Sequence, residues 1–148
     1  TRLPTSMMVK DYMEPQTFIL HHLVKGGDLN HHGTLYAGRT AEWFVEAGFV
    51  AAASLSSPEN VVCLKIHGMK FTAPIRCGEL VRIESKVIFT GRSRMITFIR
   101  VKAHETNVVE GFITFVHVDL QGKAQPHGIE ITPVSEEDKA LYQEAQQL

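Results

Sequence analysis

The residues of this chain best suited to chemistry lie in residues 30–38, a polar stretch that runs into a long apolar segment. The stretch reads Asn-His-His-Gly-Thr-Leu-Tyr-Ala-Gly, and the segment after it carries two acids, Glu42 and Glu46. If this segment is a helix, its start presents unpaired backbone N–H groups and the positive end of the helix dipole. Such a start can stabilise a carbonyl oxygen that becomes negatively charged, and the small residues Ala37 and Gly38 let that oxygen approach. The two carboxylates are then candidate general bases.

Each of these residues also has a plain structural interpretation. Asn30 can hold a water or a substrate through its amide, but a turn Asn often bonds its own loop backbone. Glu46 is the first candidate base, or else a Glu that pairs with a basic residue or faces a partner subunit. Glu42 lies one turn earlier on the same face, where a solvated or ion-paired acid is common. Two neighbouring carboxylates would raise the pKa of one of them, which suits a base.

The histidines of the same region leave several roles open. His31 and His32 are candidates for a base or for binding substrate, and the alternative is that they form hydrogen bonds in the loop or at an interface. The His residues show no recognisable metal-ligand spacing, so no metal site is expected. His67 and Gly68 interrupt an otherwise strand-like run, which indicates a bulge or a close approach of the backbone. The functional alternative is that His67 lies near a bound substrate.

A second polar group lies in residues 90–94, Thr-Gly-Arg-Ser-Arg, at the tip of a predicted hairpin. The guanidinium groups of Arg92 and Arg94, together with Ser93, are suited to a phosphate because Arg can donate two parallel hydrogen bonds. The alternative is a solvated basic turn. Arg76, which lies between a Pro and a Gly, is a weaker candidate of the same kind.

One long helix is expected to position the first group. Residues 38–55 are apolar on nearly all sides and too long for a strand, which is typical of a buried helix. Residues 16–24 before it read as a strand, and the Lys-Gly-Gly-Asp sequence after that strand is turn chemistry. Residues 56–60 end the helix.

The rest of the chain is predicted to be mostly strands. Apolar and polar residues alternate in residues 79–89 and 94–103, as in half-buried strands. The expected order after the helix is a meander of four antiparallel strands: 61–73, 79–89, 94–103 and 108–119. A Ser followed by acids starts a short helix at 135–146. A curled sheet can wrap a helix but leaves an edge strand open, so a second copy is expected to pair with it.

Composition narrows the class of protein. The chain has 148 residues, a formal net charge of −1 and 44% hydrophobic residues, which fits one domain with its own core. The near-zero charge does not favour nucleic acid or a membrane surface as partner. No run of about eighteen apolar residues predicts a transmembrane helix, and residues 1–10 lack a signal pattern. Cys63 and Cys77 are interpreted as reduced thiols of a cytoplasmic protein.

Three blocks of sequence resemble a known family, the hotdog-fold acyl-CoA thioesterases, in particular the bacterial short acyl-CoA hydrolases. Residues 28–38 are similar to the family loop Asn-x-x-Gly-x-x-aromatic-Gly-Gly, with Ala37 in place of one Gly. The second block is Phe-x-x-Pro-Ile-Arg-x-Gly-Glu at 71–79. The third is Thr-Gly-Arg-Ser at 90–93, followed by Phe-x-Thr-Phe-Val-x-Val-Asp at 112–119. The resemblance covers residues 9–125.

This resemblance implies a fold and an assembly. The fold is α+β, a hotdog in which an antiparallel sheet wraps around a long central helix. Residues 1–148 would form one such domain, with a core at about 9–125 and a C-terminal helix at about 135–146. The resemblance also implies a homodimer that assembles into tetramers or hexamers, with active sites at the dimer interface.

The same resemblance implies an activity. Family members hydrolyse an acyl-CoA to the free acid and CoA, without a metal or an organic cofactor beyond the CoA of the substrate. Asn30 corresponds to the polar residue of the family loop, and Arg92, Ser93 and Arg94 to the turn that contacts the CoA nucleotide. His31, His32 and Ala37 are placed with them as residues that bind substrate.

One position departs from the family pattern. The family acid lies seven residues after the last Gly of the loop, and this position is Val45. Glu46 matches a second acid that many members carry, but one residue on a helix is a rotation of about 100°. A local distortion of the helix would help Glu46 to reach the place that Val45 leaves.

Three functions remain open at this stage. The first is a cytoplasmic acyl-CoA thioesterase in which Asn30 places the water or substrate, Gly38 polarises the carbonyl and Glu46 is the base. The leaving thiol has a pKa of about 8.5, so it needs no proton from the enzyme. The second is a protein that binds or senses acyl-CoA without hydrolysis, which Val45 favours. The third is a hotdog dehydratase or hydratase, which the absence of a His-plus-Glu arrangement on the helix disfavours.

Overall fold

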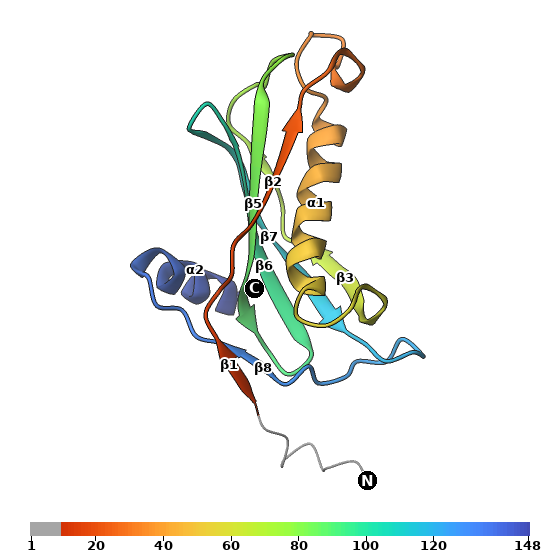
Figure 1. Cartoon of the computed structure of the whole chain (residues 1–148), viewed down its shortest axis with the longest axis vertical. Coiled ribbons are helices and arrows are strands. Elements are labelled where there is room, and N and C mark those ends of the chain that lie inside the picture. Colours follow the sequence, from red (N-terminus) through yellow and green to blue (C-terminus); the bar gives the residue numbers. More distant parts are fainter. Residues whose placement is uncertain (1–9) are drawn as a thin grey trace.

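A curved antiparallel sheet wraps one side of a long helix in the computed structural model, which describes residues 10–148 (Figure 1). The first half of the chain comprises β1 (Asp11–Met13), β2 (Phe18–Leu23), α1 (Ala37–Ala53), β3 (Val61–Ile66) and β4 (Lys70–Phe71). The second half comprises β5 (Leu80–Thr90), β6 (Arg94–Ala103), β7 (Thr106–His117), β8 (Ile129–Ile131) and α2 (Glu136–Gln146). Short 3-10 turns at Gly26–Asp28 and Pro58–Asn60 flank α1 on either side.

Helix α1 packs on the sheet through one face. Its buried residues recur at the three- and four-residue spacing of a helix face: Thr40, Trp43, Phe44, Ala47, Gly48, Ala51 and Ala52. The opposite face is exposed and carries both Glu42 and Glu46. The predicted helix is therefore confirmed, but the single chain buries one side of it and not all sides.

The strand order corrects the predicted meander. The main sheet has the order β2-β5-β6-β7-β3, with β4 also paired to β7. Strand β3 therefore lies at the far edge beside β7 and does not pair with β5, its expected neighbour. The meander consists of β5, β6 and β7 only. After β4, which pairs with β7, the chain crosses toward the opposite edge of the sheet, where β5 lies beside β2.

The predicted strand at 61–73 is divided into two. Strand β3 ends at Ile66, and the N–H of His67 donates to the carbonyl of Phe112 at 2.9 Å. Gly68 has a φ of 120°, a conformation that favours glycine. The His-Gly sequence thus breaks the strand, as its composition indicated, and β4 resumes the pairing with β7 at Lys70.

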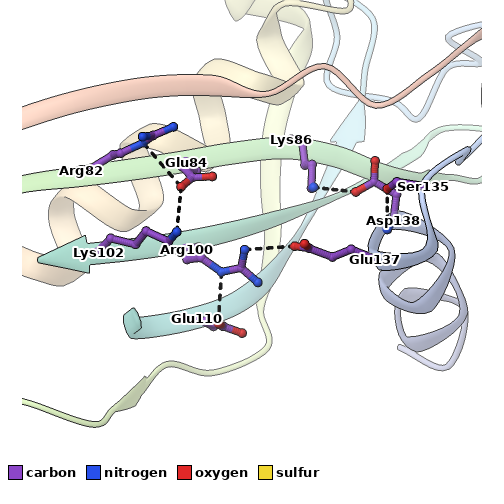
Figure 2. A network of polar contacts seen from close by, with 9 residues as sticks. All are labelled: Arg82, Glu84, Lys86, Arg100, Lys102, Glu110, Ser135, Glu137 and Asp138. Atoms are coloured by element: carbon purple, nitrogen blue, oxygen red, sulfur yellow. Dashed lines mark hydrogen bonds and ion pairs between the residues drawn. The ribbon is translucent and has the colours of Figure 1, made fainter. Parts of the chain in front are cut away.

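Helix α2 covers part of the outer face of the sheet, away from α1 (Figure 1). Leu141 and Ala145 pack there on Ile88, Ile96 and Phe98. Polar contacts fix the start of the helix, as Figure 2 shows. The N–H of Asp138 donates to the Ser135 hydroxyl at 3.1 Å; Asp138 pairs with Lys86, and Glu137 with Arg100 at 3.0 Å. The predicted helix at 135–146 is confirmed.

Four further points concern the sequence predictions. The strands β1 and β8 form a separate parallel pair that the sequence did not indicate. No helix within residues 10–148 has the length and apolar character needed to cross a membrane. Cys63 and Cys77 are both free thiols. The prediction about a signal pattern falls almost entirely on residues 1–9, which lie outside the described residues.

The core contains a polar group whose removal is expected to stabilise the protein. In the described part of the chain, the hydroxyl of Ser85 is the one buried side-chain polar atom without a hydrogen-bond partner. An unpaired buried hydroxyl costs about 1–3 kcal/mol. Ser85→Ala is therefore expected to raise the free energy of unfolding by about 1 kcal/mol in urea denaturation. A lower stability of this variant would show that the hydroxyl is bonded in solution.

Candidate active site

The two polar groups singled out in the sequence lie at opposite ends of the molecule. The loop that precedes α1 is at the upper end in Figure 1, and the turn between β5 and β6 is at the lower end. The 11 residues of β5 run between these ends, a distance of roughly 35 Å at the usual rise of a strand. A single chain therefore does not bring Asn30 together with Arg92.

Asn30 organises the loop in which it lies. Its Oδ1 accepts hydrogen bonds from the backbone N–H groups of His32 at 2.9 Å and Thr34 at 3.2 Å. Its Nδ2 donates to the hydroxyl of Thr34 at 3.1 Å. Gly33, at a φ of 78°, allows the chain to turn between them. The amide oxygen is thus used by the loop, and the second N–H of the amide is the part that a substrate or water could use.

The start of α1 has free backbone donors. Tyr36, at the N-cap, provides no side-chain hydrogen bond to the helix. Among the hydrogen bonds of residues 10–148, none has the N–H of Ala37 or Gly38 as donor. The ring of Tyr36 lies against Gly38, where an added Cβ would overlap it. Glycine at 38 therefore keeps the ring on the backbone, and the two free N–H groups fit the predicted oxyanion site.

A cavity of about 390 Å³ opens beside this helix start. Asn30, Ala37 and Thr40 line one side of it. The opposite wall comes mostly from the segment that follows β4: Leu35, Phe71, Thr72, Ala73, Pro74, Ile75 and Val108. The apolar wall beside a few polar groups is typical of a site for a small ligand with an apolar arm.

The acids of α1 lie on its exposed face and do not line this cavity. Glu42 pairs with Arg39 at 3.3 Å, and Arg39 also pairs with Asp28 at 3.2 Å. The structural interpretation of Glu42 as an ion-paired residue is therefore the one observed. Glu46 has no salt bridge within residues 10–148, which leaves its carboxylate available.

The structure contradicts the predicted distortion of the helix. The α-helical segment is continuous from Ala37 to Ala53, and Val45 packs against the core. Glu46 therefore does not take the place of Val45. Its side chain is exposed on the outer face of the helix.

The histidines lie outside the cavity beside Asn30. His31 and His32 are exposed at the loop tip, with ring centroids 3.9 Å apart. His67 lies on the outer face of the sheet, where its Nε2 bonds to the Thr114 hydroxyl at 2.6 Å. Burial lowers the pKa of His67, and the charges of Lys65 and Arg94 lower it further. Residues 10–148 contain no group of His, Cys, Asp and Glu side chains placed to hold a metal ion.

The turn at the other end of the sheet borders a cavity of about 420 Å³. Arg92 lines it together with Lys10, His127 and Glu130. Lys10 pairs with Glu130 at 3.7 Å. The backbone of the turn is fixed by the N–H of Gly91, which donates to the carbonyl of Arg94 at 3.0 Å. Two cations beside a cavity suit a phosphate group. Lys10 and His127 were not predicted here, because they come from segments far from Arg92 in the sequence.

Comparisons with known proteins agree on one family. The sequence pattern of the Thioesterase superfamily matches residues 32–110. The uncharacterized acyl-CoA thioester hydrolase YkhA of Bacillus subtilis is 30% identical over 126 residues, which cover 81% of this chain and 72% of that protein.

Solved structures extend the similarity to the fold. An apo-hexameric acyl-CoA thioesterase is 30% identical, with a TM-score of 0.82 over 88% of this chain and 86% of that one. The acyl-CoA hydrolase of Bacillus cereus is 26% identical, with a TM-score of 0.83 and coverages of 88% and 82%. A hexameric hotdog-fold thioesterase of Campylobacter jejuni is 27% identical, with a TM-score of 0.66 and coverages of 84% and 94%. The predicted hotdog fold is confirmed, and the roles of the individual site residues stay predictions.

Variants of Asn30 separate its place in the loop from a role toward substrate. Asn30→Asp keeps an oxygen that accepts from residues 32 and 34 but loses the amide N–H groups. We expect this variant to melt near the unaltered protein and to lose about 100-fold in thioester turnover. Asn30→Ala loses both functions and is expected to be less stable by about 1 kcal/mol. Full turnover in Asn30→Asp would restrict Asn30 to its structural role.

Proposed function

The chain belongs to the thioesterase superfamily, and on this premise we propose that it hydrolyses an acyl-CoA to the free acid and CoA. The observation that carries the proposal is the start of α1, where Ala37, one of two residues with an unpaired backbone N–H, lines an apolar cavity. This arrangement fits a thioester whose carbonyl oxygen lies on the helix start and whose acyl chain lies against the apolar wall.

The reaction needs few groups. The N–H groups of Ala37 and Gly38 stabilise the oxygen that becomes negative when water adds to the thioester carbon, and one such donor contributes about 3–4 kcal/mol. The free amide N–H of Asn30 orients the substrate or the water. In the proposed dimer, Glu46 of the second copy, which is directed outward from its own helix, accepts the proton of the attacking water, and the CoA thiolate leaves without a proton from the enzyme. Only protein groups and water act in this scheme, so it gives no role to a metal or an organic cofactor.

A second copy of the chain is part of the proposal. Strand β3 lies at an edge of the sheet and exposes Val62, Leu64 and Ile66 at 50%, 64% and 43%. Two copies related by a twofold axis perpendicular to this edge strand pair in antiparallel fashion, since such an axis reverses the direction of the strand. The upper end of one copy then lies beside the lower end of the other. Asn30 of one copy would therefore face the turn of Arg92, Ser93 and Arg94 of the second copy.

Two finer statements belong to the same proposal. Dimers of this kind are expected to assemble further into tetramers or hexamers, and hexamers are known for thioesterases of similar structure. We place the protein in the cytoplasm, since Cys63 and Cys77 are both free thiols, as is usual in a reducing compartment.

The main alternative is a protein that binds acyl-CoA without hydrolysing it. One observation favours it: Val45, at the position of the family acid, packs against the core while Glu46 is directed outward. Binding of CoA without turnover, together with turnover gained by Val45→Asp, would support this alternative.

Substitutions of the two helix acids test the assigned base. We expect Glu46→Gln to lower kcat for acyl-CoA by about 100-fold, because the amide cannot accept a proton from water. Glu42→Gln is the matched control one turn away, and its kcat should change by less than about 3-fold because Glu42 is engaged with Arg39. A substrate panel with a free-thiol readout gives both rates. Equal activity of the two variants would remove Glu46 from the mechanism.

Mixing two impaired variants tests whether the site is shared between copies. Arg92→Ala should raise KM for acyl-CoA about 10-fold through loss of a phosphate contact, with little effect on a thioester that lacks the nucleotide. When Asn30→Asp and Arg92→Ala chains are unfolded together and refolded, half of the dimers are mixed and each restores one site. About a quarter of the sites should then be intact, measured at low substrate concentration. No recovery above the sum of the two variants would place each site within a single chain.

A further inference from the structure

A serine and a histidine far apart in the sequence meet at the lower end of the molecule. Ser56 follows the C-terminus of α1, and His117 is the last residue of β7. The Ser56 Oγ and the His117 Nε2 lie 2.9 Å apart, although the residues are 61 positions apart. Ser56 is exposed and His117 is half-buried. The contact therefore joins an accessible hydroxyl to an imidazole that the fold holds in place.

The hydrogen bonds of His117 determine which ring nitrogen carries the proton. The Nδ1 lies 3.0 Å from the backbone carbonyl of Gln125, which can only accept, so Nδ1 is the N–H donor. The Nε2 of the neutral ring then has a free lone pair and accepts from the hydroxyl of Ser56. The backbone N–H of Gln125 donates in return to the carbonyl of His117 at 2.8 Å, which fixes the ring relative to this segment.

Neighbouring residues of the same types are bonded differently. The Nε2 of His127 bonds to the carbonyl of Arg94 at 3.1 Å, and its Nδ1 accepts from the N–H of Ile129 at 3.0 Å. Both ring nitrogens of His127 are thus hydrogen-bonded to the backbone. Ser54 donates to the carbonyl of Ala51 at 2.6 Å, and Ser57 donates to the side chain of Asn60 at 2.6 Å. Of these three serines, Ser56 is the one that donates to an imidazole.

We propose that Ser56 and His117 form a nucleophile–base pair that accepts an acyl group from an activated ester or thioester. A nucleophile within hydrogen-bond reach of a base, itself oriented by a third group, is the arrangement found at covalent catalytic sites. The pair lies beside the basic turn of Arg92 and Arg94, because the N–H of His117 donates to the carbonyl of Ser93 at 2.8 Å. Anionic acyl donors are therefore the favoured class.

Within one chain this pair is far from the start of α1; in the proposed dimer it would lie on the copy that contributes the basic turn to the shared site. The 17 residues of α1 place its start roughly 25 Å from Ser56. In the acyl transfer, the Ser56 Oγ bonds to the acyl carbon while its proton passes to the Nε2 of His117. The thiolate or alkoxide leaves and takes that proton. Water then attacks the acyl-serine, His117 accepts a proton from the water, and the Oγ regains a proton as the acid is released.

Labelling with a fluorophosphonate probe tests the pair directly, since this electrophile modifies activated serines. Peptide mass spectrometry of the labelled full chain is expected to locate the adduct on Ser56. His117→Gln should slow labelling by about 100-fold, because the amide cannot act as a base. Ser54→Ala, a matched change in the same turn, should label at the original rate. No adduct on Ser56, or an unchanged rate in His117→Gln, would overturn the proposal.

A thiol scan gives a second readout that does not depend on catalysis. A cysteine beside an imidazole is more reactive, because the charged ring stabilises the thiolate. We expect the thiol introduced by Ser56→Cys to react with Ellman's reagent at least about 10-fold faster than that of Ser54→Cys. This difference should vanish when His117→Gln is added, while thermal denaturation shows all variants folded. Equal rates at the two positions would exclude His117 as a base for residue 56. Neither readout uses acyl-CoA turnover, so a failure here leaves the proposed function untouched.

Discussion

The close packing of α1 on the inner face of the sheet is the constraint on which both ends of the molecule depend. Ala47, Gly48, Ala51 and Ala52 form the buried middle of this face. A Cβ on Gly48 would lie 3.1 Å from the side chain of Ile99 and 3.2 Å from that of Ile113, so glycine permits the observed approach. With the small residues seated on the sheet, the helix has little freedom to slide or rotate. Its start is held beside the cavity, and its end is held beside β7.

A second consequence is that one chain does not bring its two candidate polar groups together. The helix and the long strands run along the long axis of the molecule, so the groups at the two ends are separated by the length of these elements (Figure 1). The free N–H groups lie at one end, and the cavity with Arg92 and Lys10 lies at the other. A substrate with a reactive acyl end and a distant phosphate end could use both groups only across two copies. In the proposed dimer, the exposed edge strand β3 would provide the surface for that pairing.

Local sequence patterns predict the elements of this fold, but they do not predict the pairing of strands that lie far apart in the sequence. The span of α1 followed from continuous apolar character, and β5 and β6 followed from strict alternation. The place of β3 depends on its pairing with β7, about 50 residues later, which no local signal encodes. The three-residue strands β1 and β8 are too short to carry a pattern.

The candidate site shows the same limit. The sequence indicates the loop that carries Asn30, and the structure shows this Asn in the turn geometry that the residue type allows. Lys10 lines the cavity beside Arg92 only because the fold brings the N-terminal part of the chain to the turn between β5 and β6. The contact of Ser56 with His117 depends on a sequence separation of 61 residues. Residue types thus indicate which groups can react, whereas only the fold decides which of them meet.

The position of Glu46 follows from the packing of its neighbours. To direct Glu46 toward the cavity of its own chain, α1 would have to rotate by about 100°, one residue of helix. That rotation would withdraw Ala47 and Gly48 from the sheet and expose the apolar surface that they cover, at about 25 cal/mol for each Å². The helix is instead regular through this region, with Val45 packed against the core. Glu46 can therefore meet a thioester only on the outward side of α1, where the second copy would lie. In the proposed dimer, a base at this position would have its substrate at the seam between two chains, and a carboxylate that is a surface group in the single chain would become a site residue.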